Sequence, residues 1–152
     1  MTNFSFHTNP IDPVPLLNNT TDGGIAILRF DDFLTSARNS IRFVTAGWKL
    51  FETLIVRQEA TGTRENLSKD HYYLLIFFKG KKPAYFDKKH ILIPTKHPGK
   101  VWGSITERQT DGSLRKMGTI KNKTMKCPGT IWQDSDDIIE KLKKCFSSEK
   151  PK

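Results

Sequence analysis

Apolar side chains between positions 30 and 44 recur at three- and four-residue spacing, which is the period of one helix face: Phe30, Phe33, Leu34, Ala37, Ile41 and Val44. Asp31 and Asp32 start the predicted helix, where the positive end of a helix dipole favours carboxylates. Gly47 predicts the end of the helix, because an interior glycine costs about 1 kcal/mol relative to alanine but is favoured as a C-terminal cap. The β-branched residues that follow predict a strand from Trp48 to Val56.

Seven apolar residues without alternation run from Tyr72 to Phe78. Such a run predicts a central strand that is covered on both faces, at least partly by the preceding helix. The aromatic residues in it also suit a base-stacking strand, but buried strands have the same composition, so core packing is the favoured interpretation. Two further short strands are predicted at Tyr85–Phe86 and His90–Ile93.

The segment from Val101 to Lys121 is predicted to be a hairpin, because Asp111-Gly112 is the sequence signal for a two-residue type I′ turn. In that register Arg108 faces Arg115, and two like charges so placed repel by about 0.2–1 kcal/mol unless an anion lies between them. Trp102 falls on the same face, as in proteins that track phosphates and stack the bases of single strands. An ordinary solvated sheet face has the same pattern, so both interpretations stay open.

The two ends of the chain carry different signals. Residues 1–24 are rich in proline, asparagine and glycine turn signals, which predict an extended N-terminal arm without regular structure. Near the C-terminus, an apolar stripe predicts a final helix that Ser135 or Asp134 caps, and residues 148–152 form a tail. The predicted fold class is α+β: a single domain over residues 25–147, with a four- to five-stranded antiparallel meander, an N-terminal helix packed on one face and a C-terminal helix.

Positive charge is concentrated in one segment of the chain. From Lys79 to Lys126 there are thirteen Lys/Arg against three acids, net +10, whereas the whole chain of 152 residues carries +9. Everything outside this segment therefore sums to −1, and such segregation predicts a polyanionic partner. Lysines in turns also have a second explanation, since they block edge-to-edge pairing of strands.

No strong catalytic motif is present: there is no Walker A loop, no Gly-x-Gly-x-x-Gly, no Cys-x-x-Cys and no Gly-x-Ser-x-Gly. His90 and His97 lack the companion cysteines or carboxylates of a metal site. Cys127 and Cys145 are too few for a disulfide framework. Neither a signal-peptide pattern nor an apolar run of about 18 residues is visible, so we expect a soluble intracellular protein without cofactor or metal.

The function that these patterns favour is non-catalytic nucleic-acid binding through a basic face of the antiparallel sheet, with single strands as the favoured partner. The expected contact residues are Lys79, Lys81, Lys82, Lys88, Lys89, Lys100, Trp102, Arg108, Arg115 and Lys121. One alternative is a protein-interaction module whose basic surface docks on an acidic protein or an anionic membrane. The other is a small metal-independent ribonuclease, because a helix followed by a basic antiparallel sheet resembles the barnase-like ribonuclease toxins. A homodimer is compatible with each of them.

Overall fold

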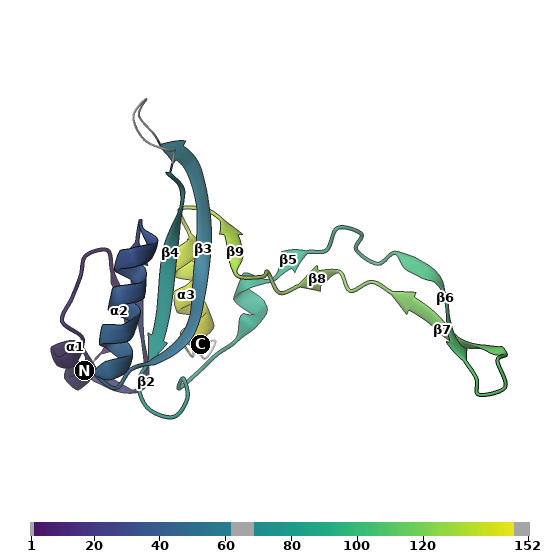
Figure 1. The fold of residues 1–152 in the computed structure, drawn as a ribbon, viewed down its shortest axis with the longest axis horizontal. Helices are drawn as coiled ribbons and strands as arrows, with labels where there is room; N and C mark the ends of the chain where they lie inside the picture. Colours follow the sequence, from purple (N-terminus) through teal and green to yellow (C-terminus); the bar gives the residue numbers. More distant parts are fainter. Residues whose placement is uncertain (1, 62–68, 148–152) are drawn as a thin grey trace, which may run out of the picture. The chain divides into compact units, whose positions relative to one another are not determined.

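The structure is a computed structural model that describes residues 2–61 and 69–147, and it falls into two compact units. The first unit comprises Met1–Ile91 with Gly129–Lys152, and the second comprises Leu92–Pro128. The elements of the first unit are β1 (Thr2–His7), α1 (Pro13–Asn19), β2 (Thr20–Phe30), α2 (Phe33–Thr45), β3 (Lys49–Thr61), β4 (Lys69–Phe78), the 3₁₀ helix η1 (Lys88–Ile91), β9 (Ile131–Gln133) and α3 (Ile138–Phe146) (Figure 1).

The first unit is built on a five-stranded sheet with the strand order β1-β2-β4-β3-β9. Strand β4 lies in the centre and is antiparallel to both β2 and β3, whereas β1 is parallel to β2 and β9 is parallel to β3. The sheet is therefore mixed, and the predicted antiparallel meander is wrong. The error has three causes: β1 comes from the expected arm, β9 was not predicted as a strand, and the hairpin after residue 100 belongs to a separate two-stranded sheet.

Both faces of this sheet are covered, which explains why Tyr72–Phe78 has no polar position. Alternate residues of β2, β3 and β4 pack with α3 in one core: Ile25, Ile27, Leu54, Val56, Tyr72, Leu74, Ile76, Ile138, Leu142, Cys145 and Phe146. The other alternate residues of β2 and β4 pack beneath α1 and α2 (Figure 1), together with Phe43 of α2 and Trp48: Ala26, Leu28, Phe30, Leu75 and Phe77. The prediction of a central strand covered on both faces is confirmed.

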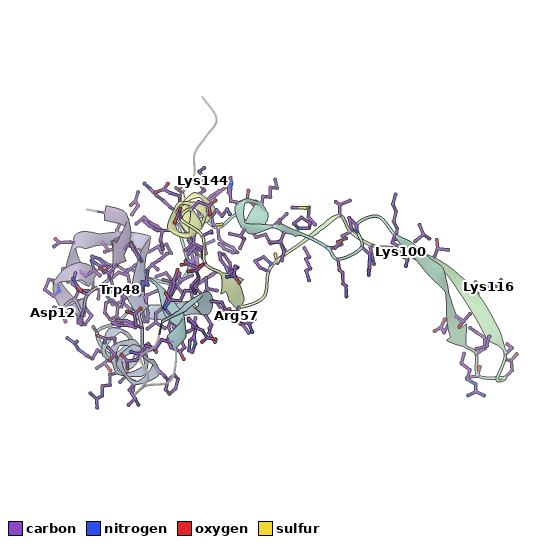
Figure 2. The ribbon with its side chains drawn as sticks, turned by 90° about the horizontal axis from the view of Figure 1, so that it is seen from above. Asp12, Trp48, Arg57, Lys100, Lys116 and Lys144 are labelled. Atoms are coloured by element: carbon purple, nitrogen blue, oxygen red, sulfur yellow. The ribbon has the colours of Figure 1, made fainter. Side chains whose placement is uncertain are left out.

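Trp48 connects α1 with the face of the sheet that α2 covers, and Figure 2 labels it within the first unit. Its ring is almost fully buried, and its Nε1–H donates a hydrogen bond to the Pro13 carbonyl oxygen at 3.0 Å. Phe43 lies between Trp48 and Phe77, with ring centroids 5.7 Å and 4.8 Å away. The tryptophan thereby fastens the start of α1 to the α2 face of the sheet.

The predicted ends of α2 are confirmed, because local signals determine them. The Asp32 carboxylate accepts a hydrogen bond from the Thr35 N–H at 2.7 Å, and Gly47 follows the helix with φ +104°. The buried stripe of α3 is confirmed too, but its N-cap is Asp137 without a side-chain capping bond, so the predicted cap by Ser135 or Asp134 is wrong.

Three further sequence predictions are wrong: the arm without regular structure and the strands at Tyr85–Phe86 and His90–Ile93. Residues 1–24 hold β1, α1 and the start of β2, since Phe4 and Phe6 alternate with polar residues and pack against the α3-side core. Tyr85–Phe86 is not a strand, and His90 lies in η1. The division into an arm, a domain at 25–147 and a tail stays a prediction, and residues 148–152 lie outside the described part of the chain.

The second unit is an antiparallel two-stranded ribbon. Strand β5 (Ile93–Pro94) pairs with β8 (Met125–Lys126), and β6 (Val101–Arg108) pairs with β7 (Leu114–Lys121) (Figure 1). Between the two pairs, the Asn122 N–H donates to the Lys100 carbonyl oxygen at 2.9 Å, so the pairing continues from one to the other. The predicted hairpin is confirmed, and we call Leu92–Pro128 the basic ribbon.

Gly23 offers a test of the packing at one end of the sheet. It has φ +77°, and an added Cβ would lie 2.6 Å from the backbone nitrogen of Ala84, whose N–H donates to the Gly23 carbonyl at 2.9 Å. We expect Gly23→Ala to lower the free energy of unfolding by about 1–3 kcal/mol, measured by urea denaturation. Gly129→Ala is the control, since nothing lies within 4 Å of its added Cβ. Equal effects of the two substitutions would contradict this account.

Candidate nucleic-acid interface

The basic ribbon carries most of the net charge of the protein. Its 37 residues hold eight Lys/Arg against two acids, so it accounts for +6 of the formal +9. All eight cationic residues are exposed, and Figure 2 labels Lys100 and Lys116 among them: Lys96, Lys100, Arg108, Arg115, Lys116, Lys121, Lys123 and Lys126. Lys96, Lys116, Lys123 and Lys126 were not among the predicted contacts, although the charge count had already included them.

The ribbon has no core of its own among the side chains that the structure describes. None of those side chains is buried, and even Val101 and Leu114 are exposed. Backbone pairing and the turn therefore hold the ribbon together, and isolated hairpins of this kind are only marginally stable in water. Both faces of the ribbon consequently meet either solvent or a partner.

The register of the hairpin differs from the predicted one by one residue. The Gly112 N–H donates to the Gln109 carbonyl and the Gln109 N–H donates to the Ser113 carbonyl, both at 2.9 Å, which closes a three-residue loop. Gly112 has φ +85°, as the third residue of such a loop requires. Arg115 consequently faces Glu107, and the predicted opposition of Arg108 and Arg115 is wrong.

The observed register brings a different pair of cations together. Lys116 lies opposite Thr106, and Arg108 lies two residues further along the same strand, so Arg108 and Lys116 are diagonal neighbours on one face. Diagonal neighbours have Cα atoms about 7–8 Å apart, within reach of one shared anion for such long side chains. In the described part of the chain neither of the two forms an ion pair with an acid.

The ten predicted contact residues divide between the two units. Lys100, Arg108, Arg115 and Lys121 lie on the basic ribbon, together with Trp102, whose side chain lies outside the described part. In the first unit, the Lys79 ammonium donates to the carbonyl oxygens of Leu17 and Thr20 at 2.8 and 2.7 Å, which gives it a structural role at the end of α1. Lys81 and Lys82 line a cavity of about 590 Å³, and Lys88 and Lys89 lie on η1.

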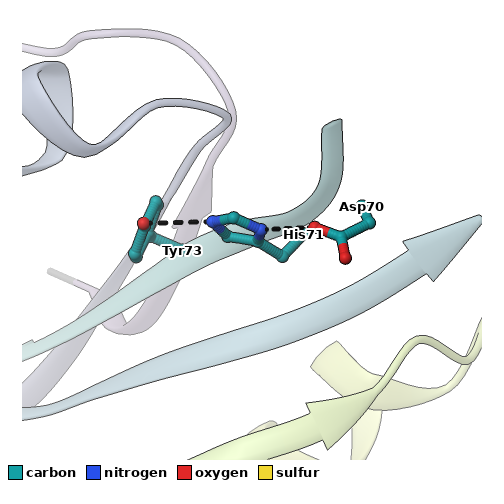
Figure 3. Close-up of polar contacts among 3 residues, drawn as sticks. All are labelled: Asp70, His71 and Tyr73. Atoms are coloured by element: carbon teal, nitrogen blue, oxygen red, sulfur yellow. Dashed lines mark hydrogen bonds and ion pairs between the residues drawn. The ribbon is translucent and has the colours of Figure 1, made fainter. Parts of the chain in front are cut away.

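A second group of polar side chains lies at the start of β4 (Figure 3). His71 Nδ1 is 2.8 Å from Asp70 Oδ1, and His71 Nε2 is 3.1 Å from the Tyr73 hydroxyl. The arrangement satisfies all three groups when Nδ1–H donates to the carboxylate and the phenol donates to Nε2. The hydrogen bond from His71 holds the pKa of Asp70 below its usual value. The His71 ring is therefore held between a carboxylate and a phenol at this end of β4.

The adjacent Tyr72 points to the opposite face of the sheet. Its hydroxyl donates to Asp134 Oδ1 at 2.7 Å, and the Arg29 guanidinium lies 3.9 Å from its ring centroid. Burial, followed by the hydrogen bond to Asp134, raises the pKa of Tyr72. Tyr72 therefore stays a neutral donor that ties β4 to the residue after β9. No group of three or more His, Cys, Asp or Glu among the described residues is placed to hold a metal ion.

No family model matches the sequence, and no curated protein matches it. Solved structures that are similar to part of the chain include two of M1.HpyAVI. One is the complex of M1.HpyAVI with SAM, with a TM-score of 0.49 and 9% identity over 57% of this chain and 47% of that one. The other is M1.HpyAVI itself, with a TM-score of 0.46 and 11% identity over 58% and 50%. The chain thus spans about half the length of these structures.

The predicted function, a non-catalytic nucleic-acid-binding protein that uses a basic face of an antiparallel sheet, is wrong in that form. The main sheet is mixed and both of its faces are covered by helices, so it has no basic face to offer. In the described part of the chain, no helix is long and apolar enough to cross a membrane.

The contact between Asp70 and His71 predicts a pH effect. Because the pKa of Asp70 is lowered in the folded protein, its contribution to stability is present above the unfolded pKa and is lost as the pH falls through the folded pKa. We expect His71→Ala to raise the pKa of Asp70 towards its ordinary value, measured by NMR titration of the carboxyl carbon. Asp111, whose pKa is lowered by hydrogen bonds from Ser113, should not change. An unaltered Asp70 titration in the variant would contradict this assignment.

Proposed function

We propose that this protein binds duplex DNA through the basic ribbon, with the cations of the ribbon contacting phosphates on either side of a groove. The observation that carries the proposal is the charge of +6 on 37 residues, with every Lys and Arg among them exposed. Phosphate contacts supply most of the affinity of a protein for nucleic acid, and they need cations free of competing acids. Arg108 and Lys116 meet that condition among the described residues.

The shape of the ribbon favours a DNA duplex over other nucleic acids. The major groove of B-form DNA is about 12 Å wide and admits a two-stranded β-ribbon. The corresponding groove of duplex RNA is deep and too narrow for side chains to enter. Preference for single strands depends on stacking at Trp102, whereas the duplex proposal needs only the paired backbone and the exposed cations.

The two faces of the ribbon have different parts in this proposal. Arg108 and Lys116 share one face and bind one phosphate strand, while Arg115 lies on the other face beside Glu107. Lys121 pairs with Val101 at the far end of the hairpin, and Lys100 precedes that pair. Such contacts position the protein and carry no base information. Lys81, Lys82, Lys88 and Lys89 stay predicted contacts, and Lys79 is left out because carbonyl oxygens already hold it.

The double variant Arg108→Gln/Lys116→Gln tests the proposed phosphate contacts. We expect weaker binding to a labelled DNA duplex and a plot of log affinity against log salt that is flatter by about 2, because two phosphate contacts are lost. Fluorescence anisotropy over a salt series measures both quantities. Lys143→Gln/Lys144→Gln in the last turn of α3 removes the same charge from the first unit and should leave the slope unchanged.

The choice of nucleic acid is tested with the unaltered protein. DNA duplex should bind more tightly than an RNA duplex or a DNA single strand of the same sequence. Tighter binding to the single strand would contradict insertion of the ribbon into a groove. The absence of binding to all three at low salt would contradict a nucleic-acid partner altogether.

A further inference from the structure

Helix α2 packs with its polar side towards the sheet. Its buried residues are Ser36, Asn39 and Phe43, of which only the last is apolar. Leu34 and Ile41 are 66% and 69% exposed, and Val44 is 52% exposed. A surface helix normally turns its apolar stripe to the core and its polar side to solvent, and α2 does the reverse over most of its length.

The polar residues beneath α2 have partners within the helix itself. The Ser36 hydroxyl donates to the Phe33 carbonyl at 2.9 Å, and Asn39 Nδ2–H donates to the Thr35 carbonyl at 2.8 Å. Because of these hydrogen bonds, burying the two polar groups costs little free energy. The exposed stripe has no matching explanation inside the first unit, and an exposed contiguous apolar surface marks an interaction site.

The exposed stripe has the spacing of a helix-pairing seam. Leu34, Ala37, Ile41 and Val44 occur at intervals of three, four and three residues, which are the a and d positions of two successive heptads. Ala37 is half-buried and the other three are exposed. This spacing places the four side chains on one face of α2, and it is the spacing along which two helices pair.

The seam is complementary to itself when a second α2 runs antiparallel to the first. Pairing Leu34 with Val44 of the other copy places Ala37 opposite Ile41 in the next layer, so a small side chain meets a large one. The two-fold axis then repeats both contacts with the roles of the two copies exchanged. Each copy contributes the same patch, as an isologous dimer interface requires.

The charges beside the seam also fit an antiparallel pair. Arg42 lies on one flank of the helix in its last turn, and Asp31 precedes the N-cap Asp32 at the other end, so an antiparallel partner brings the acidic end of one copy near the cation of the other. Arg29 Nε lies 3.5 Å from Asp31, yet the Asp31 side chain is still 63% exposed. Arg38 lies on this flank near the two-fold axis. There it lies close to Arg38 of the other copy, and the two like charges oppose association.

From these features we infer that α2 is a homodimer interface, and that its occupant is α2 of a second copy of this chain in antiparallel orientation. The inference does not depend on the proposed binding of DNA, because α2 and the basic ribbon belong to different units. Helix α2 has 13 residues, so it is about 20 Å long. One pair of such helices lies at the low end of interface sizes, below about 1,200 Å², and the dimer is therefore a weak one.

The test is sedimentation of the full chain from about 1 µM to about 1 mM, a range that covers weak association. A reducing agent is present throughout, because Cys127 is exposed and would otherwise link copies covalently. The wild type should shift from monomer to dimer across this range. The variant Leu34→Glu/Ile41→Glu should raise the dissociation constant at least about tenfold, since it places carboxylates in the seam.

Two further variants separate this interface from a general effect of charge or exposure. Val14→Glu replaces a valine of α1 that is exposed to the same extent as Val44, and it should leave the dissociation constant unchanged. Arg38→Ala should tighten the dimer, because it removes the like-charge contact at the axis. A wild type that stays monomeric to about 1 mM would overturn the inference. A doubly substituted protein that still dimerises like the wild type would overturn it as well.

Discussion

Strand β4 is stable only when both of its faces are shielded from water. The arrangement of the first unit follows from that requirement. Its buried run alternates between two cores, so Leu74 and Ile76 need α3 while Leu75 and Phe77 need the side of α2. Each such side chain contributes about 1.5–3 kcal/mol when fully buried. A strand with two apolar faces also needs a neighbour on each edge, which β2 and β3 provide.

The basic ribbon obeys the opposite constraint. None of its described side chains is buried, so backbone hydrogen bonds and the turn at Gly112 hold it together. The buried cores that stabilise the protein thus lie in the first unit, whereas most of the net charge lies on the basic ribbon. Substitutions on the ribbon consequently change its surface with little effect on the buried cores, which makes its cations suitable for tests of binding.

Local signals explain which parts of the fold were predictable from the sequence. Asp32 and Gly47 fix the ends of α2, and the uninterrupted run in β4 identifies the central strand without knowledge of its neighbours. The parallel edge strand β9 has no such signal, because it has three residues and its partner β3 lies more than seventy positions away. The turn of the hairpin was ambiguous for a related reason: Asp111-Gly112 suits a two-residue loop and also the end of a three-residue loop. The charge of the candidate site was therefore predictable, but the pairing of its arginines was not.

The periodicity of an amphipathic helix does not show which surface its apolar face contacts, and α2 is an example. The spacing of Leu34, Ile41 and Val44 establishes that they share a face, but it does not establish what that face meets. In α2 the sheet is met by Phe43 together with Ser36 and Asn39, whose hydrogen bonds to their own helix remove most of the cost of burying them. The apolar face is then left for a surface outside the first unit. A helix whose buried polar groups form hydrogen bonds within the helix can therefore pack its polar side against a sheet and leave its apolar side for a second partner.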